Sequence, residues 1–422
     1  MQNTLHWQET IPVRGRFDVI VAGGGVSGAA AALSAARMGK SVLLLEKQTL
    51  LGGLATSGLV NFWVPSCNGR GRQIVRGMAE EFLALTRKYG FDQYPDAWAH
   101  GEPKEPTNER LHGWFSGGFF ALCLLETLTD AGVKVMYDAL VSAPVMDGGV
   151  CRGLIVDGKS GRGYYEAGVV VDATGDADIL RRAGVPTVDG QNYFTCYGEG
   201  VSLAGCEEAV RRQNVYYAYT HNYGGTANLY GGNHPEGMPT FPGMEAEMVS
   251  DYLQQNHLLM LEKEKGKPRF ARNIHMLPGM AQLRTTRRID GDATLTGEDC
   301  YRHCETSIGT IPDFDNRDRL YEVPYGTLIR TGYHNLITCG RSASASGWGW
   351  DVLRVIPPAI LTGQAAGAAA AMALDAGCAL ADISVPALQE HLAATGVIIH
   401  FDDAWVPAKA AADEAAAAEG HL

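Results

Sequence analysis

A glycine-rich turn between two apolar segments constrains the fold of this chain more than any other feature. Residues 17–22 are apolar and rich in Val and Ile, and a G-x-G-x-x-G motif starts at residue 23. Residues 26–38 are rich in Ala, and residues 41–45 (SVLLL) are apolar again. Short apolar runs are typical of buried strands, and small residues suit a helix packed closely on a sheet. The pattern predicts strand, tight turn, helix and parallel strand, which is one half of a doubly wound α/β sheet.

The three glycines and an acidic residue after the second strand predict a dinucleotide site. Gly23 permits the tight turn, Gly25 lets the backbone approach a pyrophosphate, and Gly28 lets helix and strand pack closely. The helix N-terminus then faces the anion. Glu46 ends the second strand, where a carboxylate accepts hydrogen bonds from a ribose diol and repels a 2′-phosphate. The site therefore suits NAD or FAD better than NADP.

Three further segments favour FAD over NAD. They are EKQTLLGGLATSGLVN at 46–61, VVVDATGDADI at 169–179, and NLITCGRSASASGWGWDVLRVIPPAILTGQAAG at 335–367. Each is a strand end or a glycine-rich loop that is suited to touch one long ligand. FAD, unlike NAD, needs protein along a ribityl chain and an isoalloxazine ring.

In their order and spacing these segments resemble the FAD-dependent oxidoreductases of the glutathione-reductase superfamily, in particular a single-flavin bacterial group. The resemblance covers residues 17–185 and 321–380. It implies a Rossmann-like FAD-binding domain with a β-meander and an inserted α+β cap or substrate domain. We therefore expect the FAD-binding domain at 1–185 and 321–422 and the cap at 186–320, where the regular alternation of strands and helices is lost.

The resemblance also assigns residues to the cofactor. Those residues are Gly23, Gly25, Val26, Ser27, Gly28, Glu46, Lys47, Gly53, Leu54, Ala55, Thr56, Ala173, Thr174, Gly175, Asp176, Gly340, Arg341, Arg354, Val355 and Pro357. One position departs from the superfamily. Many members have Gly-Asp in the late motif, where the Asp binds the ribityl chain, whereas this chain has Gly340 followed by Arg341.

The sequence predicts one flavin and direct hydride transfer at its N5. It has no second G-x-G-x-x-G between a strand and a helix and no C-x-x-C redox pair. The candidates for catalysis are Arg341 and Arg354 as cations beside the reduced ring, Trp350 with Trp348 as an aromatic wall, and His112, Tyr325, His221 and His234 for proton transfer. Core packing is the competing explanation for the tryptophans. Cys67 and His112 are also candidates for a covalent flavin link.

Arg284, Arg287 and Arg288 form a basic cluster in an acidic chain. Two explanations remain open at this stage. The arginines pair with Asp290 and Asp292, or they bind a carboxylate or phosphate of the substrate. On a strand, Arg287 and Arg288 point to opposite faces, so they cannot both reach one ligand.

Charge and cysteine content indicate which binding partners and which cellular compartment to expect. The formal net charge of -12 argues against nucleic acid and against an anionic membrane surface. The nine cysteines are scattered and fit a reducing cytoplasm. Cys300 and Cys304 flank His303 but lack two further ligands nearby, so we expect no metal. The first 17 residues lack the apolar core of a signal peptide, and residues 359–381 are Ala-rich, as in a buried core helix.

The remaining elements follow from periodicity. We expect helices at 73–89, 119–131 and 358–374, strands at 133–137, 167–172 and 335–338, and an antiparallel meander at 140–166.

Residues 216–243 are rich in Tyr, Asn, His and Gly. This composition favours a small polar substrate, such as a sugar-like, hydroxy or carboxylate compound. A prenyl or steroid-like substrate and a non-redox flavin module are the alternatives. The electron donor or acceptor stays open, and a homo-oligomer is possible.

Overall fold

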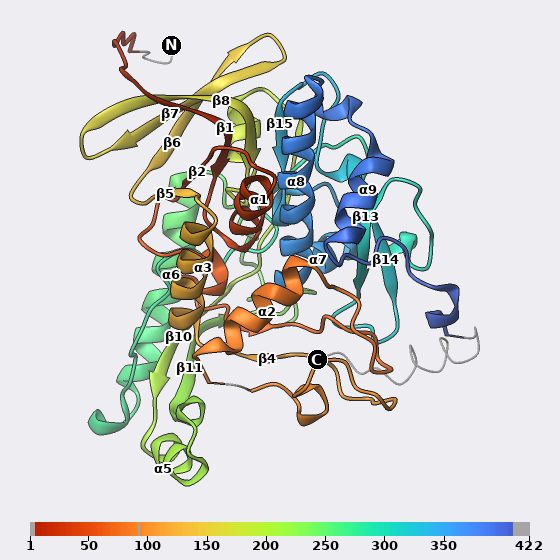
Figure 1. Ribbon diagram of the computed structural model, residues 1–422. Helices are drawn as coiled ribbons and strands as arrows, with labels where there is room; N and C mark the ends of the chain where they lie inside the picture. The colour runs from red at the N-terminus through yellow and green to blue at the C-terminus, as the bar shows by residue number, and fades with distance from the viewer. Residues whose placement is uncertain (1–4, 92, 408–422) are drawn as a thin grey trace.

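The computed structural model describes residues 5–91 and 93–407 and contains one large mixed sheet. Its strand order is β5-β2-β1-β8-β7-β6, and β15 also pairs with β8. The strands of this sheet are β1 (Val13–Ala22), β2 (Val42–Leu45), β5 (Lys134–Met136), β6 (Leu140–Asp147), β7 (Val150–Gly158), β8 (Gly161–Asp172) and β15 (Leu336–Thr338). Strands β5, β2, β1, β8 and β15 are parallel, and β6, β7 and the first half of β8 form the expected meander (Figure 1).

Strand β8 serves both parts of this sheet. Its residues 161–166 pair with antiparallel β7, and its residues 170–172 pair with parallel β15. Strand β1 pairs with β8 over nearly its whole length on the other edge. The end of the expected meander and the expected strand at 167–172 are therefore one continuous strand of 12 residues.

Helices cover one face of the parallel strands. They are α1 (Val26–Arg37), α2 (Met78–Lys88), α3 (Gly117–Asp130), α8 (Ile356–Ala376) and α9 (Val385–Ala394). Val19 and Val21 of β1 face these helices, whereas Ile20 and Ala22 face the meander and the short helix α4 (Asp178–Arg182). Because successive residues of a strand point to opposite faces, the all-apolar end of β1 serves two cores.

Small residues allow helices α1 and α8 to lie side by side (Figure 1). A Cβ on Gly363 would lie 2.1 Å from the carbonyl oxygen of Ser27, and one on Gly367 would lie 2.2 Å from that of Ala31. Among the described residues α8 is the one helix that is long and apolar enough to cross a bilayer, and 78% of its most apolar window is buried inside the protein. The alanine-rich segment is therefore packed as a core helix.

The helix expected at 73–89 begins only at Met78, so the prediction is wrong for residues 73–77. Gly77 has φ 66° and ψ -133°, which is not helical. Gln73 instead bridges to Cys67, and its backbone N–H donates to Glu102. These contacts hold the segment in an extended loop.

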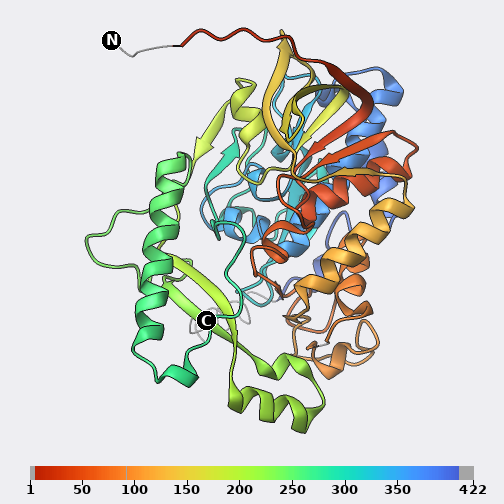
Figure 2. The same ribbon diagram turned by 90° about the vertical axis from the view of Figure 1, so that its left-hand side faces the viewer.

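A second group of elements lies within the region expected as the cap, and this group is called the cap below. It contains the ribbon of β10 (Thr195–Val201) and β11 (Tyr219–Thr226), the helices α5 (Leu203–Arg212) and α6 (Ala246–Lys265), and the pair β9 (Thr187–Asp189) and β12 (Arg287–Ile289). Figure 2 shows α6 and the ribbon extending together away from the central sheet. Phe194, Phe241, Tyr252 and Leu283 form its own small core.

The remaining strands form two short antiparallel pairs, and one further helix follows them in the chain. They are the short ribbon of β3 (Phe62–Trp63) and β4 (Gly113–Trp114), the hairpin of β13 (Ser307–Pro312) and β14 (Leu320–Pro324), and helix α7 (Trp348–Leu353). Residues of the β13–β14 hairpin share the large core with α8.

Candidate functional site: a cavity at the strand ends

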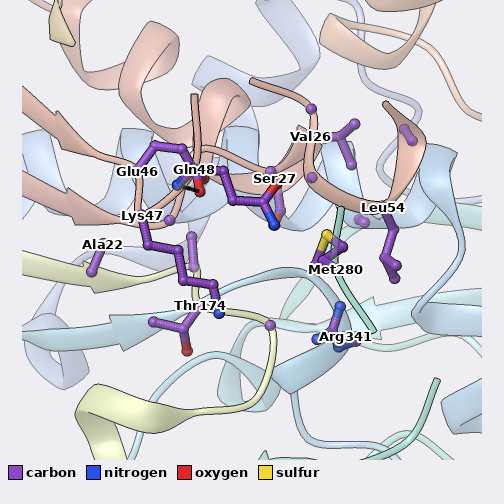
Figure 3. Close-up of a pocket in the computed structure, with 18 of the residues that line it drawn as sticks. Ala22, Val26, Ser27, Glu46, Lys47, Gln48, Leu54, Thr174, Met280 and Arg341 are labelled. Carbon is purple, nitrogen blue, oxygen red and sulfur yellow. Dashed lines mark hydrogen bonds between the residues drawn. The ribbon is translucent and has the colours of Figure 1, made fainter. Parts of the chain in front are cut away.

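The main cavity lies where β1, β2 and β8 end and α1 begins. It is open to solvent and has a volume of about 210 Å³. Residues from all the sequence motifs line it: Gly23, Gly25, Val26, Ser27, Glu46, Lys47, Gly53, Leu54, Ala55, Ala173, Thr174, Gly175, Arg341, Arg354 and Val355. Figure 3 shows Glu46 and Ala22 at one end of this cavity and Leu54 and Met280 at the other.

The backbone of the glycine turn leaves room for an anion. Gly23 has φ +109°, and a Cβ there would lie 2.3 Å from the carbonyl oxygen of Ala173. A Cβ on Gly28 would lie 1.9 Å from the carbonyl oxygen of Gly23. Gly28 therefore packs beneath the turn and does not line the cavity. A Cβ on Gly25 would meet nothing within 4 Å, so the N-terminus of α1 is open to the cavity, as a pyrophosphate requires.

Glu46 holds the turn and also faces the cavity. Its two carboxylate oxygens accept backbone N–H bonds from Gly24 (2.7 Å) and Gln48 (2.8 Å), and the residue is buried. Each carboxylate oxygen keeps a further acceptor position for a ribose hydroxyl. Lys47 extends along the cavity toward Thr174 (Figure 3).

The loop after Glu46 lies against the glycine turn. Gly52 forms a bridge with Gly25, and its N–H donates to the carbonyl of Gly24 (2.8 Å). Gly53 lines the cavity, whereas Thr56 does not. The Thr56 hydroxyl donates to the carbonyl of Leu51, so its role is to shape the loop.

Asp172 organises the segment that follows β8. Its carboxylate accepts from the N–H and hydroxyl of Thr174 and from the N–H groups of Ile179 and Leu180 at the start of α4. These bonds fix Ala173, Thr174 and Gly175 along the cavity wall. Sequence reasoning did not assign a role to Asp172, although it lies inside the quoted motif.

Arg341 links the segment after β15 to the segment after β8 through an ion pair with Asp176. Its guanidinium donates to both oxygens of Asp176 (3.1 and 2.8 Å), and a Cβ on Gly175 would lie 2.7 Å from its Cζ. Arg341 lines the cavity, and Asp176, which was expected to do so, is held behind it as the counter-ion. Arg341 therefore presents a positive charge to the cavity in a fixed position.

Some residues of the segment 335–367 line the cavity, and others pack behind its wall. Gly340 has φ +71° and packs on Ser27, where a Cβ would come within 2.6 Å of the hydroxyl oxygen. Gly340 and Pro357 do not line the cavity, whereas Val355 and Ile356 at the start of α8 do. Arg354 also lines the cavity, and it donates twice to one oxygen of Asp351 (2.9 and 2.6 Å).

Of the expected catalytic side chains, Arg341 and Arg354 line the cavity, whereas Tyr325, Trp348, Trp350, His112, His221 and His234 do not. Tyr325 is buried in the core and its hydroxyl donates to the carbonyl of Leu380 (2.8 Å), which places it away from any substrate. Trp350 is buried and donates from Nε1 to the carbonyl of Arg341 (2.7 Å), so it supports that arginine. His234 has both ring nitrogens within hydrogen-bond distance of backbone groups of the cap.

His112 belongs to an aromatic cluster that begins at the cavity wall. Phe62 lines the cavity and packs on His112 (5.6 Å between ring centroids) and Trp114 (5.1 Å). Trp114 in turn packs on His221 of the cap (4.6 Å), which also contacts Tyr197 (5.0 Å). Burial lowers the pKa of His112, with Arg110 adding to the effect, and burial lowers the pKa of His221.

Cys67 is unsuited to a covalent flavin link. The residue is fully buried, and its sulfur accepts the N–H of Leu111 (2.9 Å). Burial raises the pKa of the Cys67 thiol, which keeps it protonated.

The arginine cluster separates into three unrelated environments. Arg287 pairs with Asp189 (3.2 Å) and Asp178 (3.7 Å), so of the two explanations ion pairing holds for this residue, with partners other than Asp290 and Asp292. Arg288 donates to the hydroxyl of Ser344 (3.0 Å).

Arg284 is half-buried, and its Nη1, which is shielded from solvent, has no hydrogen-bond partner among residues 5–91 and 93–407. Burial, with the neighbouring charge of Arg354, lowers the pKa of Arg284 to about 10. Arg284 is therefore a half-buried cation near the cavity-lining Arg354 that lacks a full counter-ion.

Sequence reasoning missed the apolar part of the cavity. Val60, Phe62 and Val64 line it, together with Met280 from the cap and residues 139–141 at the start of β6. The alternation of Val60, Phe62 and Val64 at every second position was a usable signal for one side of an extended segment. Met280 carried no such signal, because only the folding of the cap brings it to the wall.

Comparisons with known proteins agree with this geometry. The FAD dependent oxidoreductase family matches residues 18–234 and 246–392. Digeranylgeranylglycerophospholipid reductase from Methanoculleus marisnigri is 26% identical over 180 residues, which are 42% of this chain and 43% of that protein. The matched part is thus less than half of the relative's length.

Solved structures with similar chains have low sequence identity. The p-nitrophenol 4-monooxygenase PnpA from Pseudomonas putida DLL-E4 is 15% identical with a TM-score of 0.46, covering 90% of this chain and 84% of that chain. A geranylgeranyl bacteriochlorophyll reductase-like protein from Thermoplasma acidophilum is 14% identical with a TM-score of 0.44, covering 96% of each chain. The family match does not depend on them. Because that match takes in most of the 422 residues, the chain belongs to the FAD dependent oxidoreductase family and is an FAD-dependent oxidoreductase.

Proposed function

We propose that this enzyme transfers hydride between FAD and an apolar, unsaturated substrate of the prenyl or steroid-like kind. The observation that carries the proposal is the set of apolar side chains Val60, Phe62, Val64 and Met280 that line the cavity, of which Met280 lies at the end away from Glu46 (Figure 3). Such a wall gains free energy by covering hydrocarbon and offers a polar substrate no hydrogen-bond partners.

FAD supplies the hydride chemistry when it is bound, and the residues of the cavity fit it. The open backbone at Gly25 and the N-terminus of α1 would hold the pyrophosphate. Glu46 would accept the ribose hydroxyls. Arg341 and Arg354, each tied to one aspartate, would place positive charge beside the phosphate, ribityl and ring region. The part of the cavity that would remain for the substrate is the part lined by Val60, Phe62, Val64 and Met280.

The aromatic cluster extends this apolar surface toward the cap. Phe62, Trp114 and His221 pack in sequence from the cavity wall to strand β11. His112 and His221 have lowered pKa values, so both rings are uncharged at neutral pH. An uncharged aromatic surface suits a hydrocarbon chain.

The polar residues of 216–243 do not argue for a polar substrate, because the cap itself uses them. Asn228 accepts the N–H groups of Tyr230 and Gly232 in a turn. Asn222 donates to the carbonyl of Asn273. The composition that favoured a sugar-like substrate thus reflects local hydrogen bonding, and the named reductase among the relatives further favours a prenyl group.

Anaerobic reoxidation of the reduced enzyme tests this proposal. We would reduce the bound flavin and follow its reoxidation after adding a geranylgeranyl compound; in parallel, we would add a sugar or a hydroxy acid to the oxidised enzyme and follow the bleaching of the flavin. We expect reoxidation by the prenyl compound and no bleaching by the polar compounds. We expect Val64→Asp to slow the reoxidation by about tenfold or more, because a charge enters the apolar wall. Val13→Asp, on an exposed valine of β1, is the matched control. Turnover of the polar compounds with no response to the prenyl compound would overturn the proposal.

One observation favours a second candidate, a substrate with a carboxylate or phosphate. Arg284 is a half-buried cation whose shielded Nη1 has no partner in the described part of the chain, and it lies close enough to Arg354 for their charges to interact. An acidic substituent would supply the missing counter-ion. In the same assay, this candidate predicts that prenyl diphosphates react and the corresponding neutral prenols do not, and that Arg284→Met removes the difference.

A further inference from the structure

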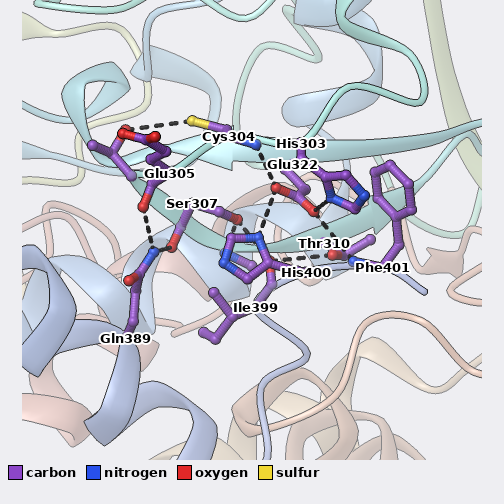
Figure 4. A network of polar contacts seen from close by, with 12 residues as sticks. His303, Cys304, Glu305, Ser307, Thr310, Glu322, Gln389, Ile399, His400 and Phe401 are labelled. Atoms are coloured by element: carbon purple, nitrogen blue, oxygen red, sulfur yellow. Dashed lines mark hydrogen bonds and ion pairs between the residues drawn. The ribbon is translucent and has the colours of Figure 1, made fainter. Parts of the chain in front are cut away.

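A cluster of two histidines and a glutamate lies outside the flavin cavity. His303 precedes β13, Glu322 lies on β14, and His400 belongs to the segment after α9. None of the three lines the cavity. The segment with His400 is held on the hairpin, because the N–H of Thr310 donates to the carbonyl of Ile398 (2.7 Å). The folded chain thus brings together ligand types from three separate segments (Figure 4).

The donor atoms of the cluster converge on one point. His303 Nδ1 lies 2.7 Å from one oxygen of Glu322, and His400 Nδ1 lies 2.9 Å from the other. The three ligand atoms lie within 4.8 Å of one another. Tetrahedral zinc with bonds near 2.0–2.1 Å holds its ligand atoms about 3.3 Å apart. Side-chain movements of about half an ångström would therefore admit an ion between them.

Further groups orient these ligands as they do in metal sites. His303 Nε2 lies 2.9 Å from Asp403, and the imidazole stacks on Phe401 (4.3 Å between centroids). Glu322 accepts the backbone N–H groups of Cys304 (2.6 Å) and Phe401 (3.2 Å). A histidine ligand usually donates its second N–H to a carboxylate in this way, which fixes the ring and the tautomer.

The exposure of the three side chains is also compatible with metal binding. The side chain of Glu322 is fully buried, whereas those of His303 and His400 are each 46% exposed. A buried carboxylate supplies charge to attract a cation, and the exposed imidazoles leave a path for the ion and a position for water. We propose that His303, Glu322 and His400 bind one divalent transition-metal ion of the zinc class, which fastens the segment around His400 to the β13–β14 hairpin.

The ligands that accompany His303 come from distant parts of the chain. In the sequence, His303 stands between Cys300 and Cys304, and no further metal-binding residues lie at zinc-finger spacing. The structure places the His303 ring against Glu322 and His400 instead, while the Cys304 sulfur contacts the hydroxyl of Thr306. The ligand set is therefore two imidazoles and a carboxylate, without thiolate.

Metal titration of the full-length flavin-loaded protein tests this proposal. After treatment with a chelator, the protein is titrated with Zn²⁺ or Co²⁺, and bound metal is counted after gel filtration. We expect one equivalent of metal, a visible ligand-field band for Co²⁺, and a higher thermal midpoint. Asp403→Asn should weaken binding by about 10- to 100-fold, since it removes only the partner of His303.

His400→Gln removes one ligand and should weaken binding further, with the flavin spectrum as the check on folding. His100→Gln, on an exposed histidine, is the matched control. Failure of the unaltered protein to bind one equivalent would overturn the proposal and leave a hydrogen-bonded network. Binding that persists unchanged in His400→Gln, or a Co²⁺–thiolate charge-transfer band, would also overturn it, because the metal would then lie on cysteines.

Discussion

At the residue scale, the contact between cap and cavity depends on histidines that are held uncharged. His221 packs between Trp114 and Tyr197, and His112 packs on Phe62. Burial opposes protonation of both rings, and Arg110 adds to this at His112. The unfolded chain titrates these groups near pH 6.5, whereas the folded protein takes up the protons only at lower pH. Unfolding is therefore favoured as pH falls below about 6.5 through the folded pKa values.

We predict that His221→Phe makes the protein less sensitive to acid. The phenyl ring keeps the aromatic packing and cannot be protonated. Between pH 7.5 and 5.5 the thermal midpoint of the variant should fall less than that of the unaltered protein, by roughly 1–2 °C. Scanning calorimetry at the two pH values measures this difference, with His100→Phe as the exposed control. Equal falls in all three proteins would show that His221 is not held neutral by the fold.

Single residues also show what a motif can and cannot specify. Gly23, Gly25 and Glu46 were predicted from spacing, and all three line the cavity. Thr56 and Gly340 belong to equally clear motifs, yet they pack one layer beneath the wall. A motif marks where backbones approach one another closely. Which atoms face the ligand depends on the neighbouring segments.

At the scale of elements, the sheet and its helices follow from sequence because their signals are local. Apolar runs gave β1, β2 and β15, and small residues gave α1 and α8. The continuous strand β8 was divided in two, because residues 161–166 have one face in the meander while residues 169–172 are buried on both. The start of α2 was misplaced because the contacts that hold residues 73–77 come from Glu102 and Gln364, far along the chain.

Close packing of α1 on α8 leads to a second prediction. Gly363→Ala would drive a methyl group into the backbone of Ser27, at the turn that faces the cavity. We expect a loss of about 1–3 kcal/mol in unfolding free energy, measured by denaturant titration, together with weaker FAD binding. Gly118→Ala on α3, where a Cβ meets nothing within 4 Å, is the control and should change stability by less than about 1 kcal/mol. Equal stability of the two variants would contradict the packing argument.

At the scale of the whole molecule, the glycine turn and the strand ends around the cavity were predictable, and its apolar lining was not. The cavity wall combines Val60 and Phe62 with Met280, which is more than 200 residues further along the chain, and no local pattern relates these positions. Composition was misleading for the cap, because Asn228 and His234 serve turns and backbone bonds. The histidine–glutamate cluster was invisible for the same reason, since His303 and His400 are far apart in sequence.

The most direct test of this interpretation is the absorbance spectrum of the purified protein before and after acid precipitation. The geometry at Gly25 and Glu46 predicts a flavin spectrum. The buried, protonated thiol of Cys67 and the position of His112 outside the cavity wall predict that the flavin is released into the supernatant as free FAD. Flavin that stays in the pellet would contradict the noncovalent site. A colourless protein that remains colourless after incubation with FAD would contradict the assignment of the cavity to this cofactor.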